Sequence, residues 1–293
     1  MRRPPLLRSL FALSLFLCSK TALALPLPDD QLVEQGSARL EAGDADAAIL
    51  LFREAEKRAP KDPRPHFLRG AALAKKKDGP GAISAYRAAL ALDGKLAAVH
   101  NELGALLQES GKIDEAASEY QKAIAANPQL GEAFYNLGKI QSQKEDHAAA
   151  ITSLKSAAQL LPKDADVRID LSVAYRKANR NEDAVRAARE AVALDGASEA
   201  THLNLGFALQ AAGKEGDAEG EFKTALRLDP KSATAYWALG KIEGGRKHPG
   251  PAIVALQHAY DLKPSPSILS DLVHAYFDAG QGAKAEKLVR AKI

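Results

Sequence analysis

Residues 131–164 read GEAFYNLGKIQSQKEDHAAAITSLKSAAQLLPKD, a segment with two apolar helical patterns that are separated by a polar turn and closed by a proline. The same frame of 34 residues fits the chain without gaps, starting at residues 29, 63, 97, 131, 165, 199 and 233. A period of this length is typical of arrays in which each repeat is one helix hairpin. The chain is therefore predicted to be a helical repeat protein. We number positions from the first residue of each copy.

Three positions of the frame carry small residues in nearly every copy. Position 8 holds Gly36, Gly70, Gly104, Gly138, Ser172, Gly206 and Gly240. Position 20 holds Ala48, Ala82, Ala116, Ala150, Ala184, Ala218 and Ala252, and position 27 holds Ala55, Ala89, Ala123, Ala157, Ala191, Ala225 and Ala259. Small residues at fixed helix positions let two helices approach closely. A larger side chain there is expected to cost roughly 1–3 kcal/mol through overpacking.

Bulky residues and helix breakers occupy two further columns. Position 24 supplies the bulk, with Phe52, Tyr86, Tyr120, Leu154, Ala188, Phe222 and Leu256. Position 32 is a helix breaker in every copy, namely Pro60, Gly94, Pro128, Pro162, Gly196, Pro230 and Pro264. Each second helix is therefore expected to end before the next copy begins.

These columns closely resemble the tetratricopeptide repeat (TPR) family from Asp29 to Pro266. The copies that start at residues 131 and 199 match best, whereas the copy that starts at 165 departs most, because it has Ser172 for glycine and Ala188 for an aromatic residue. The resemblance implies an all-α fold, a right-handed superhelical α-solenoid of about seven to eight helix–turn–helix repeats. The seven repeats are predicted at residues 29–62, 63–96, 97–130, 131–164, 165–198, 199–232 and 233–266.

Residues 267–293 follow the same pattern with the frame shifted by one residue. Residues 267–279 are predicted to form one helix and residues 284–293 a second, with Leu288, Val289 and Ile293 on one side and charged residues on the other. A terminal repeat needs a polar outer face because nothing stacks beyond it. This segment is therefore predicted to be a degenerate eighth repeat that caps the array.

Two joints between paired helices are rich in glycine and proline, at residues 78–81 and 244–251. We expect these joints to be looser and more mobile than the others. In the second, the preceding helix is expected to lose its last turn, with Pro251 opening the next helix.

Residues 1–24 have the pattern of a secretory signal peptide. Basic residues at the start precede an apolar run from Leu10 to Cys18, and Ala22-Leu23-Ala24 is a small-x-small cleavage site. Cleavage is expected after Ala24, which makes the protein exported, periplasmic or extracellular, with residues 25–28 as a short lead-in. The alternative is an uncleaved membrane anchor, although the apolar run is shorter than the ~20 residues that a spanning helix needs.

Removal of this segment changes the overall charge and the cysteine content. The full chain has 40 Lys and Arg against 37 Asp and Glu, and residues 1–24 hold four of the basic residues and no acid. The mature chain therefore has 36 against 37, a net charge of −1, which argues against nucleic-acid binding. The single cysteine, Cys18, also leaves, so no disulfide or thiol chemistry is expected.

No catalytic or cofactor motif is found in the sequence. Nucleophile elbows, paired metal-binding histidines and dinucleotide fingerprints do not occur, so we predict no enzyme activity, no cofactor and no metal site. Three of the seven histidines, His66, His100 and His202, stand at position 4 of their copies. We interpret them as packing residues rather than ligands, because no carboxylate or cysteine is seen to complete a site.

The first helix of each pair is expected to carry the binding surface. In the resembling family this helix lines the concave side through about positions 2, 5, 6, 9, 12 and 13, and the family's chaperone-tail clamp needs Lys at position 5 with Asn at position 9. No copy has that pair. The predicted groove residues are Phe67, Asn101, Tyr135, Asn136, Asp170, Asn204, Phe207 and Trp237.

Two interpretations of these residues stay open. In the first, Asn136, Asp170 and Asn204 hydrogen-bond the backbone of an extended ligand, while Tyr135, Phe207 and Trp237 receive its side chains. In the second, the polar residues are simply common at position 6 and the apolar ones pack between neighbouring helices. Tyrosine and tryptophan are enriched in both roles.

The preferred hypothesis is an exported, non-enzymatic scaffold that binds a protein or peptide in the groove of the third to seventh copies. An alternative is an envelope assembly factor held at the membrane by an uncleaved leader. A third is a hydrolase or carbohydrate-active protein whose site the sequence does not reveal. Partner identity and oligomeric state are left open by the sequence.

Overall fold

The structure is a computed structural model that describes residues 28–290, all of it helices and short joints. The predicted signal peptide lies outside the described residues. The described helices are α2 (Pro28–Glu41), α3 (Ala45–Arg58), α4 (Pro63–Lys75), α5 (Gly79–Leu92), α6 (Ala97–Glu109), α7 (Ile113–Ala126), α8 (Gly131–Gln143), α9 (His147–Leu160), α10 (Ala165–Lys177), α11 (Asn181–Leu194), α12 (Glu199–Ala211), α13 (Glu215–Leu228), α14 (Ala233–Gly245), α15 (Pro249–Leu262), α16 (Pro266–Asp278) and α17 (Gly282–Arg290). The all-α repeat fold predicted from the sequence is confirmed.

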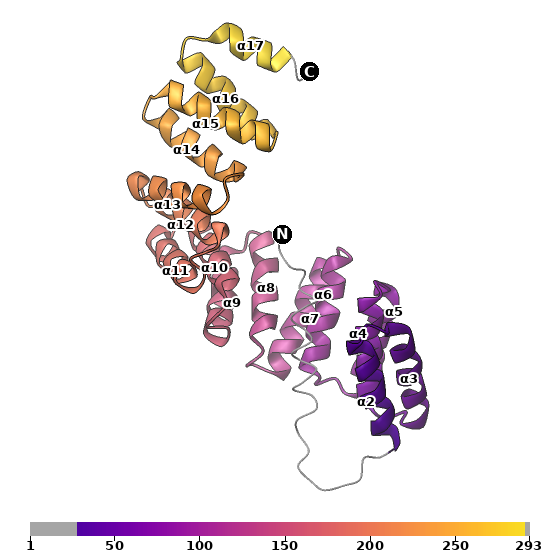
Figure 1. The fold of residues 1–293 in the computed structure, drawn as a ribbon. Helices are drawn as coiled ribbons and strands as arrows, with labels where there is room; N and C mark the ends of the chain where they lie inside the picture. The colour runs from indigo at the N-terminus through magenta and orange to yellow at the C-terminus, as the bar shows by residue number, and fades with distance from the viewer. Residues whose placement is uncertain (1–27, 291–293) are drawn as a thin grey trace. The chain divides into compact units, whose positions relative to one another are not determined.

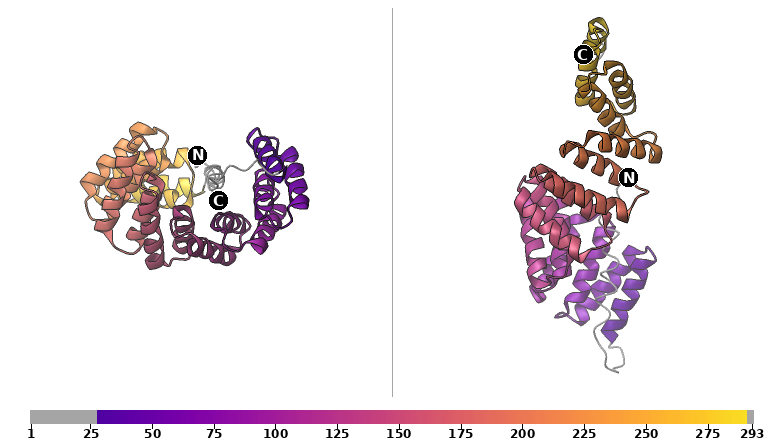
Figure 2. Two further views of the ribbon diagram at one scale, coloured as in Figure 1. Left: turned by 90° about the horizontal axis from the view of Figure 1, so that it is seen from below. Right: turned by 90° about the vertical axis from the view of Figure 1, so that its left-hand side faces the viewer.

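The chain divides into two compact units, one up to Ile140 and one from Gln141 onward. Within each unit, antiparallel helix pairs follow one another along the chain, as Figure 1 shows for α2–α7 and α10–α17, and Figure 2 gives two further views. We call the first helix of each pair the A helix, at positions 1–13, and the second the B helix, at positions 17–30.

Every joint between an A helix and its B helix turns in the same way. Position 15 has a left-handed backbone in all seven copies, at Gly43, Lys77, Gly111, Glu145, Asn179, Gly213 and Lys247. In three copies an aspartate at position 16 then accepts a hydrogen bond from the backbone N–H of the third helical residue, as Asp78 does from Gly81 at 3.0 Å. The joint at 78–81 is thus a capped helix start.

The joint at 244–251 also keeps the common geometry. The helix α14 extends to Gly245 and has the same 13 residues as other A helices, so the predicted loss of its last turn is wrong. The next helix begins at Pro249, not at Pro251, because a proline within the first turn loses no intrahelical hydrogen bond. Mobility at this joint stays a prediction.

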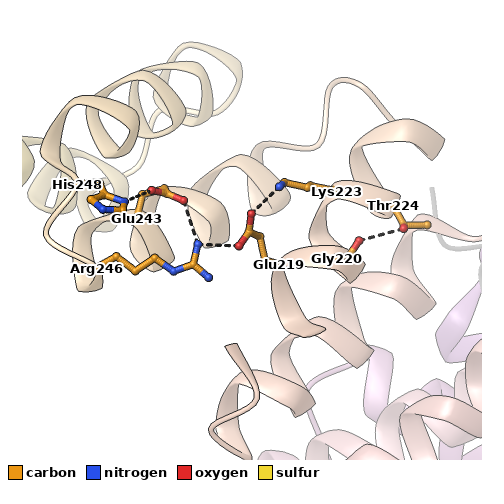
Figure 3. Close-up of polar contacts among 7 residues, drawn as sticks. All are labelled: Glu219, Gly220, Lys223, Thr224, Glu243, Arg246 and His248. Carbon is orange, nitrogen blue, oxygen red and sulfur yellow. Dashed lines mark hydrogen bonds and ion pairs between the residues drawn. The ribbon is translucent and has the colours of Figure 1, made fainter. Parts of the chain in front are cut away.

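Ion pairs also tie this joint to the preceding helix α13, as Figure 3 shows. Arg246 Nη1 donates to Glu219 Oε2 at 2.7 Å, and Lys223 Nζ donates to Glu219 Oε1 at 2.5 Å. These two cations lower the pKa of Glu219. On the other side of the joint, His248 Nδ1 lies 3.0 Å from Glu243 Oε2. Residues 246–248 are therefore held at both ends of the turn.

The core consists of the small and bulky columns identified in the sequence. All fourteen alanines at positions 20 and 27 have 0% exposure. The position-24 residues are equally buried, and in most copies their rings or branches cover the glycine at position 8. A Cβ added to Gly206 would lie 2.5 Å from Phe222 Cε1, and one added to Gly70 would lie 2.4 Å from the Tyr86 ring. The predicted close approach of paired helices is confirmed.

In the fifth copy, the residue at position 8 is larger and the residue at position 24 is smaller than in the other copies. Ser172 replaces the glycine and Ala188 replaces the bulky residue, and both are completely buried. Ser172 Oγ has no hydrogen-bond partner. The helix pair α10–α11 therefore keeps a buried contact at these positions without a bulky residue at position 24.

The last two described helices, α16 and α17, form one more pair, and their role as a capping repeat stays a prediction. Leu272 and Ala275 of α16 pack against Leu256 and Ala259 of α15, with Leu288 of α17 at the edge of this cluster. Charged residues of α17 are exposed, as expected for a cap. Val289, which the sequence pattern placed on the same side of the helix as Leu288, is exposed. Residues 291–293 lie outside the described residues.

Candidate ligand-binding face

Three pairs of consecutive A helices contact each other directly, namely α2 with α4, α10 with α12, and α14 with α16. Among the described residues, no two consecutive B helices contact each other to the same extent. Stacked hairpins therefore lie closest on the side of the A helices. We call this side of each unit the A-helix face.

In the first unit the predicted site residues fall into two environments. Phe67 is 4% exposed and its ring lies 5.9 Å from that of Tyr86, so it belongs to the core rather than to an accessible surface. Asn136 Nδ2 donates to Asn101 Oδ1 at 3.2 Å, which links α8 to α6. Tyr135 is partly exposed and lies 5.1 Å from Lys139 Nζ. The structure thus brings Asn101 and Asn136 together.

Glu102, next to this pair, is a half-buried acid that was not among the residues predicted from the sequence. Burial raises the pKa of Glu102 to about 7, a weak hydrogen bond from Asn101 Nδ2 at 3.5 Å opposes this change, and the negative charges of Glu132 and Glu109 add to it. The carboxyl group therefore changes its charge near neutral pH. A lone glutamate on a helix gives no sequence signal of this kind, because the effect depends on its neighbours.

This raised pKa makes stability depend on pH. Between a pKa of 4.5 for the unfolded chain and about 7 for the folded chain, the folded state binds a proton that the unfolded state releases. Stability from this group is therefore present at low pH and lost as pH rises through 7. We expect Glu102→Gln to raise the free energy of unfolding by about 1–2 kcal/mol at about pH 8 and to change it little near pH 4. Urea unfolding at the two pH values tests this, and an equal effect at both would contradict it.

In the second unit the predicted residues Asn204 and Phe207 lie on α12 and Trp237 lies on α14, while Asp170 lies on α10. The Phe207 ring lies 6.4 Å from Trp237 and 5.1 Å from the buried Phe222. Trp237 Nε1 donates to Asp271 Oδ2 at 2.7 Å, so the indole is oriented by α16. Phe207 and Trp237 are both partly exposed.

Two cations extend this aromatic pair, and sequence analysis missed both. The Arg176 guanidinium carbon lies 5.5 Å from the Phe207 ring centroid, and Lys241 Nζ lies 5.0 Å from that of Trp237. We call Arg176, Phe207, Trp237 and Lys241 the cation–aromatic row. A signal for Arg176 existed, because the other residues at position 12 are Leu40, Ala74, Gln108, Ser142, Gln210 and Gly244.

A cavity of about 560 Å³ adjoins the end of this row. Its wall includes Lys241 of the row and Asp271, which holds the Trp237 indole. Gly244 and Gly245 leave the cavity open, since a Cβ at either would meet nothing within 4 Å. Side chains of α14, α15 and α16 thus leave a hollow large enough for part of a ligand.

Two of the position-4 histidines are held in the same way. His100 Nδ1 lies 2.6 Å from Glu119 Oε2 and its Nε2 lies 3.1 Å from the Gly94 carbonyl, and His202 makes the same two contacts with Glu221 and Gly196. A carboxylate therefore lies beside each of these two rings, although the sequence interpretation assumed that none does. It accepts a hydrogen bond that links neighbouring elements, which is a structural role.

Within residues 28–290, no group of three or more His, Cys, Asp or Glu side chains is placed to hold a metal ion. In the same part of the chain, no helix has the length and apolar character needed to cross a membrane.

The antiparallel pairs, their repeated core and the A-helix face define a helical-hairpin repeat protein. Two models of the tetratricopeptide repeat match the sequence, one at residues 33–97 and 101–165 and the other at residues 141–191. Together these matches cover more than half of the chain, and the chain belongs to the tetratricopeptide repeat family.

Solved structures give the same fold. The C-terminal part of a TPR repeat-containing protein from Cytophaga hutchinsonii is 15% identical over 82% of this chain and 99% of its own, with a TM-score of 0.66. The Pseudomonas aeruginosa protein pilF is 21% identical over 71% of this chain and 94% of its own, with a TM-score of 0.61. The TPR protein YrrB is 21% identical over 63% and 95%, with a TM-score of 0.58. The comparison with curated protein sequences finds no significant match.

Proposed function

We propose that this protein is an exported, non-enzymatic scaffold that binds a protein or peptide along its A-helix face. The observation that carries the proposal is the partly exposed cation–aromatic row of the second unit. Aromatic and arginine side chains on a rigid surface are the residues that dominate protein–protein binding energies. Among the similar structures, YrrB is described as a TPR protein with an unusual peptide-binding site.

The mechanism under this proposal is pre-organisation of the binding surface. The row lies on three successive A helices, which pack against buried alanines of their B helices and, for α12 and α14, against the buried Phe222 and Leu256. Such a surface loses little conformational freedom on binding, so most of the ordering cost falls on the ligand. A TPR scaffold therefore suits a flexible segment of a partner protein.

A pull-down from an envelope extract tests the proposal. The bait is residues 25–293, and the comparison bait carries Asn136→Ala, Phe207→Ala and Trp237→Ala. A protein retained by the first bait and lost from the second would support binding at the A-helix face. A third bait with Val254→Ala, an exposed B-helix residue, should retain the same protein. Equal capture by all three baits would contradict the proposed surface.

Export is the part of the proposal that rests on residues 1–24. N-terminal sequencing of the protein recovered from its own cells separates the two forms of the hypothesis. A start at Leu25 supports a free exported scaffold. A start at Met1 or Arg2 would instead favour the membrane-anchored assembly factor, with the same binding face.

A further inference from the structure

Arg176 is a cation that no acid of the described chain neutralises. Its guanidinium contacts the Phe207 ring, and its Nε is buried without a hydrogen-bond partner. Burial alone lowers the pKa of Arg176, with no contribution from a neighbouring charge. Most other arginines of the same unit, by contrast, are paired, such as Arg180 with Asp183 and Arg246 with Glu219. A half-buried guanidinium whose Nε has no acceptor is unfavourable in a free protein.

A second unpaired donor lies one helical turn from the same ring. Asn204 precedes Phe207 by three residues on α12, so the two side chains share a helix face. Asn204 is 6% exposed, and its amide Nδ2 has no hydrogen-bond partner. The polar atoms left unsatisfied around Phe207 are therefore both donors. A ligand that satisfies them must supply acceptor oxygens.

The cation–aromatic row extends along the A-helix face from Arg176 to Lys241. Successive separations along it are 5.5 Å, 6.4 Å and 5.0 Å, from Arg176 through the two rings to Lys241. An extended chain rises about 3.3 Å per residue, so at most about five residues span the row. Asp271 beside Trp237 offsets part of the positive charge at the Lys241 end. An anion is therefore expected to bind more tightly at the Arg176 end of the row than at the Lys241 end.

We propose that the second unit recognises an acidic side chain of an extended peptide, with the Arg176 guanidinium binding the carboxylate and Phe207 and Trp237 receiving the apolar residues that follow it. This inference rests on the proposed function and specifies its ligand. A planar guanidinium binds a carboxylate through two parallel hydrogen bonds, and these are stronger than hydrogen bonds to a neutral amide. Two peptides that differ only in having glutamate or glutamine at this position should therefore bind the protein with very different affinities.

The test is a binding titration of the full chain with two labelled peptides. One is acetyl-Ser-Glu-Ser-Leu-Ser-Leu-Ser-amide, and the other has Gln in place of Glu. Both ends are blocked, so neither peptide carries a terminal carboxylate. We expect the glutamate peptide to bind at least tenfold tighter, and we expect Arg176→Gln to abolish that preference. A third peptide, with Gln and a free carboxyl terminus, shows whether a chain end is bound instead.

The matched control is Arg180→Gln, which removes the same charge from the same repeat. Arg180 is paired with Asp183 and lies on Tyr175, so its loss should leave the glutamate preference intact. Because Arg176 has no acid partner, Arg176→Gln should leave the melting temperature unchanged or raise it. A clearly lowered melting temperature would indicate a structural role and overturn the inference.

The outcomes separate this inference from the proposed function. If both peptides bind equally and Phe207→Ala with Trp237→Ala weakens both, the face binds peptides but does not select acids. If the free carboxyl terminus alone confers tight binding, a chain end is the ligand and the side-chain proposal is wrong. If the glutamate peptide does not bind, acid recognition fails, while the pull-down with the A-helix face variants still tests the scaffold.

Discussion

Phe222→Ala should lower the free energy of unfolding by about 3–5 kcal/mol, among the largest effects that a single change in this chain can produce. The ring is fully buried, lies 5.1 Å from the Phe207 ring and covers Gly206. Its removal leaves a cavity between α12 and α13 that the rigid alanine columns cannot close. Urea unfolding followed by far-UV circular dichroism measures the change.

The partner substitution Gly206→Leu should also destabilise, by roughly 1–3 kcal/mol, because its Cβ would lie 2.5 Å from the Phe222 ring. In the double variant the leucine enters the space left by the ring. The loss should then be smaller than the two single losses combined. Gly220→Leu is the control, since a Cβ there meets nothing within 4 Å and stability should not fall. Additive losses in the double variant would show that the two positions do not pack on each other.

The second substitution with a large expected effect is Ala188→Phe in the fifth copy. It should lower the free energy of unfolding by about 3 kcal/mol, at the upper end of overpacking costs. Ala188 and Ser172 are both completely buried, so this pair has no room for a ring. Adding Ser172→Gly should recover most of that loss, because it recreates the glycine and ring found in the sixth copy. It also removes Ser172 Oγ, a buried hydroxyl without a hydrogen-bond partner.

The same denaturant series measures this rescue. Ser172→Gly alone is the necessary comparison, because glycine also weakens a helix by about 1 kcal/mol relative to alanine. A double variant as unstable as Ala188→Phe alone would show that the backbones of α10 and α11 are spaced differently from those of the other copies.

The fold could be predicted almost completely because each packing position recurs seven times in register. The glycines, alanines and rings at positions 8, 20, 24 and 27 are buried as the sequence predicts. The exceptions are local. Ion pairs such as Arg246–Glu219 tie the joint at 244–251 to α13, and these depend on contacts between elements that a periodic pattern does not contain.

The candidate site was predicted less well because exposure within one column varies. Phe67 and Trp237 both stand at position 5, yet Phe67 is buried against Tyr86 whereas Trp237 is partly exposed and bonded to Asp271. The charge of Arg176 matters because its surroundings lack an acid, and that absence is visible only in three dimensions. Lys241 at position 9 and Arg176 at position 12 were not among the predicted residues, which came from positions 5 and 6 and, for Phe207 alone, from position 9.

The central claim is that the A-helix face of the second unit binds the partner. Site-specific photo-crosslinking in the living cell tests it most directly, with p-benzoylphenylalanine placed at position 207 on α12 or at position 254 on α15. Both side chains reach the surface, and Val254 is 59% exposed on a B helix. The account predicts a discrete partner adduct from position 207 and none from position 254. An adduct from position 254 alone would place the partner on the B helices and contradict it.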